Sequence, residues 1–167
     1  MKRDVFLLII VFLASVGINS CSKDVQGYDD YNFIDQDLAG EISGTSWIYR
    51  TGNAFYIQND SSQQMLDIGI YEKVSLFPCS YAFSGNDVLF IIPNKVGLYE
   101  LNLDFENSEN NQTLTLSSVE QENLLVTEGA IEIIFIDTIQ KIVRGRIAAK
   151  YDNNNFVNGI FEVAICE

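Results

Sequence analysis

The chain has 167 residues, and its 10 basic against 23 acidic residues give a net charge of −13. A chain of this length fits a single domain. The strong negative charge argues against nucleic acid as a partner and against electrostatic attraction to anionic lipid. Histidine is absent, which excludes Ser-His and Cys-His nucleophilic schemes and every histidine metal site.

The N-terminal residues 1–20 have the pattern of a secretory signal. Lys2 and Arg3 precede an apolar run at residues 5–17, which is shorter than the about 20 residues that a bilayer span needs. The run leads into INSC at residues 18–21, which resembles the lipobox of bacterial lipoproteins. That resemblance implies removal of residues 1–20, lipidation of Cys21 and attachment to the outer membrane, facing either the periplasm or the outside. A signal followed by an incidental cysteine is the alternative.

Removal of residues 1–20 leaves 147 residues with a net charge of −14, because Lys2, Arg3 and Asp4 leave with the signal. Residues 21–40 are acidic and lack periodicity, so we interpret them as a solvated tether. One alternative is the surface-export signal of Bacteroidota lipoproteins, which CSKD at residues 21–24 partly resembles. A calcium loop is the other, although the segment lacks the ligand spacing of an EF-hand.

From residue 41 to 167 the hydrophobic pattern has a period of two, which indicates a single β domain. Strands are expected at residues 43–50, 53–58, 65–72, 88–93, 97–105, 112–117, 130–137, 140–151 and 156–166. Short, turn-rich connections favour antiparallel neighbours. The sequence therefore predicts an all-β fold, either an antiparallel β-sandwich or a lipocalin-like barrel of about 8–10 strands in meander order.

The last two strands predict a hairpin with a defined register. Directly paired residues share a face, so we expect Ala149 to pair with Val157 and Gly145 with Phe161. The even sum of these numbers requires a loop of odd length, and a three-residue turn at 152–154 with a left-handed asparagine fits. A first hairpin follows the same rule, with Trp47 opposite Ile57 and Tyr49 opposite Phe55 across a turn at 51–53.

The remaining cysteines predict a disulfide. With Cys21 assigned to lipid, Cys79 and Cys166 form an even pair in an oxidising compartment. Two separate thiols are the alternative. A bond would close a loop of about 87 residues and stabilise the fold by at most roughly 4–5 kcal/mol in the chain-entropy picture.

No catalytic motif is readable, because the chain has no CxxC, no Gly-rich phosphate loop and no G-x-S-x-G. Carboxylate pairs arise by chance in so acidic a chain. We therefore expect no enzyme, no metal and no cofactor. Aromatic rings near strand ends are candidate ligand contacts, with packing at loop bases as the alternative: Tyr71, Tyr81, Phe83 and Tyr151.

Two individual residues, Glu132 and Thr138, give further predictions. Glu132 lies in the otherwise apolar run at 130–136, and we expect it to point to solvent near a strand end rather than into a polar pocket. Thr138 lies in the tripeptide Asp137-Thr138-Ile139, which resembles the Asp-Ser/Thr-aliphatic acceptor used for O-glycosylation of exported Bacteroidota proteins. That resemblance implies an accessible, modified hydroxyl.

Longer blocks of the chain resemble a group of uncharacterised Bacteroidota lipoproteins. The matching segments are GEISGTSWIY, VGLYELNL and a C-terminal block carried by Gly129, Ile131, Ile133, Gly145, Gly159 and Phe161. The block departs at Ile147, where the group usually has Phe. The resemblance implies a small β-rich, partly lipocalin-like domain. Gly44 and Trp47 also resemble the lipocalin Gly-x-Trp start, but they are one residue further apart.

Together these observations predict a non-enzymatic binding or structural module of the cell envelope. Its expected ligand is a glycan, a peptide or a partner protein. The alternative is a lipocalin-like carrier of a small apolar molecule, which needs an internal cavity of about 300 Å³ or more. The inward positions of the expected strands are mostly large, which favours a filled core and hence the binding module.

Overall fold

The computed structural model describes residues 31–58, 62–80, 85–106, 111–119 and 123–166. Within them the chain forms eleven strands and one short 3-10 helix, η1 (Pro78–Ser80). The strands are β1 (Ala39–Ile42), β2 (Thr45–Ile48), β3 (Thr51–Gln58), β4 (Gln64–Tyr71), β5 (Asp87–Pro93), β6 (Gly97–Glu100), β7 (Leu114–Ser117), β8 (Leu124–Val126), β9 (Gly129–Asp137), β10 (Ile142–Asp152) and β11 (Asn155–Cys166).

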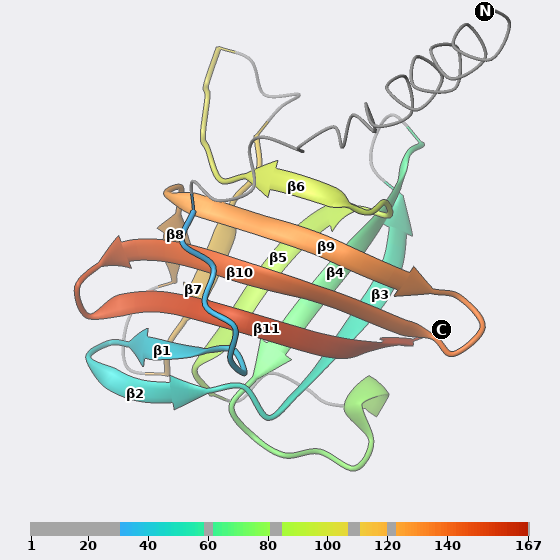
Figure 1. Ribbon diagram of the computed structural model, residues 1–167, viewed down its shortest axis with the longest axis horizontal. Helices are drawn as coiled ribbons and strands as arrows, with labels where there is room; N and C mark the ends of the chain where they lie inside the picture. Colours follow the sequence, from blue (N-terminus) through green and yellow to red (C-terminus); the bar gives the residue numbers. More distant parts are fainter. Residues whose placement is uncertain (1–30, 59–61, 81–84, 107–110, 120–122, 167) are drawn as a thin grey trace, which may run out of the picture.

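All strands belong to one sheet, which runs in the order β6-β9-β10-β11-β3-β4-β5-β7-β8, with β1 on β11 and β2 on β1 (Figure 1). Two antiparallel meanders, β9–β11 and β3–β5, are joined by the single parallel pair between β11 and β3. The predicted all-β class is confirmed. The sheet differs from a plain antiparallel meander at this joint, where the last strand returns to an early one.

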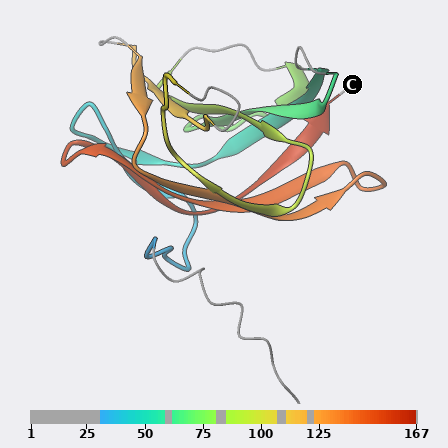
Figure 2. The same cartoon turned by 90° about the horizontal axis from the view of Figure 1, so that it is seen from above.

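The sheet curls into a half-barrel, so that β3–β5 and β9–β11 form two facing layers (Figure 2). The rings of Phe90 and Phe161 meet edge to face between the layers, with centroids 5.9 Å apart. Buried aliphatic side chains from both layers form one continuous cluster around these rings. The side chains that point inward therefore fill the space between the layers.

Hydrogen bonds draw the two ends of the curled sheet together. Beyond β6, the amide of Asn102 donates to the carbonyl of Gln112, at 2.8 Å, just before β7. The side-chain amide of Gln112 donates onward to the carbonyl of Ile91 on β5, at 2.8 Å. This link lies between β6 and the β7–β8 end and leaves the barrel partly closed.

The register of the last hairpin is as predicted. Ala149 pairs with Val157 and Gly145 with Phe161. The turn differs, because the register shifts between Lys150 and Asp152.

That shift leaves a two-residue turn at 153–154 in place of the expected three-residue turn. Asp152 pairs with Asn155, and its carboxylate accepts from the Asn154 amide at 2.8 Å and from the Asn155 side chain at 2.9 Å. A positive φ is found at Asn32, Ser43, Ser62 and Lys141 among the described non-glycine residues, so the expected left-handed asparagine is wrong. The bulge takes up the odd residue without it.

The first predicted hairpin is also wrong. Trp47 pairs with Gly40 in the β1–β2 hairpin, because the chain already reverses at Ser43 and Gly44, where φ is 55° and 71°. The same reversal overturns the companion pair Tyr49–Phe55, since Phe55 pairs with Asp67 on β4. The Trp47 indole is buried and donates to the carbonyl of Asn86 at 2.7 Å.

A disulfide joins Cys79 in η1 to Cys166 at the end of β11, with the Cα atoms 5.5 Å apart. This is the pair that the cysteine count favours. Residues 1–30, which include the signal and Cys21, lie outside the described residues. In the described part of the chain, no helix is long and apolar enough to cross a membrane.

Candidate functional site

Residues 31–38, which we call the strap, cross the outer face of β9–β11 (Figures 1 and 2). The carbonyl of Ile160 accepts from Leu38, and its amide donates to Gln36, both at 2.8 Å. The side chain of Asn158 accepts from the amide of Ile34 at 2.9 Å and donates to the carbonyl of Asn32 at 3.1 Å. Packing therefore begins within the segment that the sequence assigns to the tether.

A cation–π contact joins the middle of the strap to an ion pair within the sheet. Arg146 on β10 pairs with its cross-strand neighbour Glu132 on β9. The Arg146 guanidinium also lies 4.3 Å from the centroid of the Phe33 ring on the strap, a cation–π arrangement. The expectation that Glu132 points to free solvent is wrong, because its side chain is 15 % exposed and its carboxylate pairs with the arginine opposite it.

The start of the strap forms one wall of a groove of about 680 Å³ at the ends of β10 and β11. Its lining includes the small residues Gly129 and Ala148 and the aromatic rings of Tyr31 and Phe156. Its polar lining consists of Asn32, Glu100, Thr127, Glu128, Lys150, Asn153 and Asn158. This volume lies in the range of small-ligand sites.

Backbone geometry sets the depth of this groove. Gly129 has φ of +117°, and a Cβ there would collide with the carbonyl oxygen of Ala148. Its carbonyl accepts from Leu101 at 2.8 Å, and the carbonyl of Glu128 accepts from Lys150 at 3.1 Å. These bonds fix the turn between β8 and β9 at the groove and place two carboxylates, Glu128 and Glu100, in its lining.

The side chains that line the groove can bind a ligand. It combines two aromatic rings with carboxylates, amides and one ammonium group. Rings stack on apolar faces, and planar carboxylates and amides bond hydroxyl groups. Within the described ranges, no three histidine, cysteine, aspartate or glutamate side chains are arranged to hold a metal ion.

A buried carboxylate, that of Asp87, lies in the other layer, at the start of β5. Asp87 is 1 % exposed, and its Oδ1 has no hydrogen-bond partner. Burial, and then repulsion from Glu72, raise the pKa of Asp87 to about 6, against the lowering effects of Lys73 and the Gly85 amide. This group affects stability and does not line the groove.

The aromatic residues singled out in the sequence do not form a site. Tyr71 is buried, with its ring filling the space above Gly69 and its hydroxyl donating to Asn53 at 2.9 Å. It is therefore a packing residue, and the ligand-contact prediction for it is wrong. Tyr81 and Phe83 lie outside the described residues. Tyr151 is exposed at the β10 bulge but does not line the groove.

Thr138 is exposed in the turn between β9 and β10. The carboxylate of Asp137 accepts from the amides of Ile139 and Gln140, at 2.7 and 2.8 Å, and shapes this turn. The hydroxyl is accessible, and its modification stays a prediction.

Sequence reasoning missed the groove residues. Tyr31 falls in the acidic segment assigned to the tether, and the composition of that segment does not indicate that it packs on the sheet. Phe156 alternates outward from Val157 on the last strand, and an outward phenylalanine beside a polar turn is a readable signal of an exposed site.

No family model, curated protein or solved structure matches this chain. The resemblance to Bacteroidota lipoproteins therefore stays a prediction.

Proposed function

We propose that the chain is a non-enzymatic binding lipoprotein of the cell envelope, anchored through Cys21, which holds a short glycan in the groove beside the strap. The observation that carries the proposal is the groove itself. Its lining combines the rings of Tyr31 and Phe156 with small residues, carboxylates, amides and an ammonium group.

The filled core favours an external ligand over an enclosed one. Phe90 and Phe161 meet between the two layers, and Trp47 is fully buried. The groove lies at the ends of β10 and β11, where Leu101, Ala149 and Val157 at the edge of the buried cluster form part of its lining. The curled half-barrel is the one feature that favours the carrier as the second candidate.

Charge narrows the class of glycan. Glu100 and Glu128 line the groove, against one lysine, Lys150, on a chain of net charge −13. A polyanionic chain would be repelled, so a neutral oligosaccharide fits best.

A glycan screen with matched variants tests the proposal. Tyr31→Ala and Phe156→Ala should each weaken binding of a neutral oligosaccharide about tenfold or more, since one stacked ring contributes on the order of 1.4 kcal/mol. Tyr151→Ala removes an exposed ring outside the groove and should leave affinity unchanged. Glycan binding that survives both groove variants would place the site elsewhere. Saturable uptake of an apolar dye, competed by fatty acid, would favour the carrier.

The proposed lipidation of Cys21 is tested by a separate measurement. Intact mass of the native chain should correspond to loss of residues 1–20 and addition of lipid at Cys21. A Cys21→Ala variant that stays in the detergent phase would remove this part of the proposal without affecting the groove.

A further inference from the structure

An exposed apolar cluster precedes the disulfide. Val74, Leu76 and Phe77 are 75 %, 87 % and 73 % exposed, and we call these three residues the apolar tip. Elsewhere in the described ranges, no four consecutive positions hold three large exposed hydrophobic residues. Single exposed apolar residues are ordinary, but a contiguous group marks an interaction site.

The apolar tip is anchored at its C-terminal end. Cys79, two residues after Phe77, is bonded to Cys166 on β11. The carbonyl of Pro78 accepts from the side chain of Asn53 at 2.8 Å, and the carbonyl of Phe77 accepts from the amide of Ser80 at 3.0 Å. A preorganised apolar loop loses little conformational entropy when it inserts into a membrane or binds to a surface.

The size of the tip argues against a protein partner. A fully buried aromatic side chain covers at most about 250 Å², and three side chains of this kind or smaller do not reach the roughly 800 Å² per partner of a standard interface. Association of two copies would also bring together two chains of net charge −13. A bilayer requires no matching surface, so a small tip can enter it.

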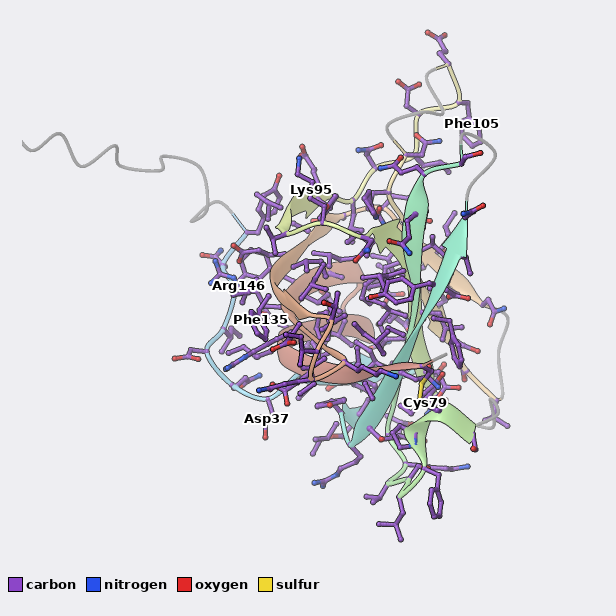
Figure 3. All side chains as sticks on the ribbon, turned by 90° about the vertical axis from the view of Figure 1, so that its right-hand side faces the viewer. Asp37, Cys79, Lys95, Phe105, Phe135 and Arg146 are labelled. Atoms are coloured by element: carbon purple, nitrogen blue, oxygen red, sulfur yellow. A yellow bond between two sulfur atoms is a disulfide. The ribbon has the colours of Figure 1, made fainter. Side chains whose placement is uncertain are left out.

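The chain before the strap keeps a bilayer within reach. Ten positions separate Cys21 from Tyr31, and a segment of that length spans at most about 35 Å. A lipid on Cys21 would therefore hold the domain within this distance of the membrane. The strap and Cys79 lie on opposite sides of the molecule (Figure 3), so the tip reaches the same bilayer only when this segment extends along the domain. Stable membrane attachment commonly uses two such signals.

We propose that the apolar tip inserts into the acyl region of a zwitterionic bilayer and forms a second membrane contact that orients the domain. This inference rests on the proposed lipid anchor at Cys21 and is independent of the groove and its ligand. The negative charge of the chain disfavours anionic membranes, so the probe is a vesicle of phosphatidylcholine.

The test places a fluorescent reporter in the tip. The full chain, produced with its leader and carrying Phe77→Trp, is reconstituted into phosphatidylcholine vesicles with brominated acyl chains. The matched control is Phe105→Trp, which replaces a phenylalanine that is 88 % exposed at the opposite end of the molecule from Cys79 (Figure 3). The signal of buried Trp47 is subtracted with the unsubstituted chain.

Brominated lipid should quench the Phe77→Trp variant at least threefold more than the control, and its emission should shift to the blue on vesicle addition. Equal quenching of both variants by aqueous iodide, without quenching by brominated lipid, would overturn the proposal. A blue shift without vesicles that grows with protein concentration would assign the tip to self-association instead. A Leu76→Trp variant repeats the measurement at the neighbouring position. Protein that is recovered without lipid is mixed with the same vesicles, and the same quenching results support or overturn the proposal.

Discussion

Gly145 and Phe161 are direct cross-strand partners, and a Cβ at Gly145 would lie 2.6 Å from Cζ of the Phe161 ring and 2.5 Å from the carbonyl oxygen of Glu132. The ring therefore occupies the volume that a side chain at Gly145 would need. Because the ring also packs edge to face on Phe90, it cannot move without disturbing the contact between the two layers.

We expect Gly145→Ala to lower the free energy of unfolding by about 1–3 kcal/mol, the usual effect of overpacking a core. Urea unfolding measures it. The control is Gly85→Ala, because the nearest atom to a Cβ there is Glu72 Oε1 at 3.4 Å, and its effect should stay within about 0.5 kcal/mol. Equal stability of Gly145→Ala and the unsubstituted protein would show that the ring has room to shift.

Asp87 predicts a specific pH dependence. Burial raises its pKa from 3.8 to about 6, so between about pH 4 and pH 6 the folded protein binds its proton more tightly than the unfolded chain does. The contribution of this group to the free energy of unfolding is therefore highest below about pH 4, falls as the pH rises, and is lowest above about pH 6. The difference is at most about 3 kcal/mol.

The variant Asp87→Asn removes this titration. Its stability relative to the unsubstituted protein should be greatest near pH 7 and should shrink as the pH falls to 4, as measured by urea unfolding at a series of pH values. Asp67, whose pKa burial also raises, keeps its own slope in both proteins. A difference that does not vary with pH would mean that Asp87 has an ordinary pKa.

The ion pair under the strap should couple energetically. We expect Glu132→Ala to cost about 1–2 kcal/mol, less than for a fully buried pair because both side chains keep some contact with water. A double-mutant cycle of Glu132→Ala with Arg146→Ala isolates the interaction, which should exceed about 0.5 kcal/mol. Additive effects would mean that the ion pair contributes no coupling energy to the fold.

The disulfide should stabilise the fold through its long loop. Cys79 and Cys166 are separated by 87 positions, so the double variant Cys79→Ser, Cys166→Ser should lose up to about 4–5 kcal/mol of unfolding free energy. Chemical unfolding with and without reductant measures this loss, and reduced protein should match the double variant. A loss below about 1 kcal/mol would indicate that the loop is already constrained in the unfolded chain.

The parts of the fold that follow from the sequence are local. Alternation along β10 and β11 defines which residues face inward, and a shared face dictates the pairing of Ala149 with Val157. Turn details were less accessible, because a bulge after Lys150 absorbs one residue without changing which faces point inward.

The missed parts depend on contacts between distant segments. The parallel pairing of Ala164 with Asn53 joins strands from opposite ends of the domain, and no local period encodes it. The strap was missed for a related reason: its acidic composition suggests solvation, while its attachment depends on Asn158 and Arg146, more than a hundred residues away. The groove could not be predicted for the same reason, because Tyr31 lines it only when the strap is attached to the sheet.

One edge of β11 is shared by two partners, since residues 156–158 pair with β1 and residues 164–166 with β3. β11 is also the last of the described strands in chain order. A nascent chain that has not yet emerged to residue 166 has unpaired edges on β1, β3 and β10 at the same time, and it lacks the second cysteine. Such edges are templates for wrong pairing, so we expect wrong pairing to be most frequent before β11 emerges. Slow emergence of residues 155–166 should prolong that exposure.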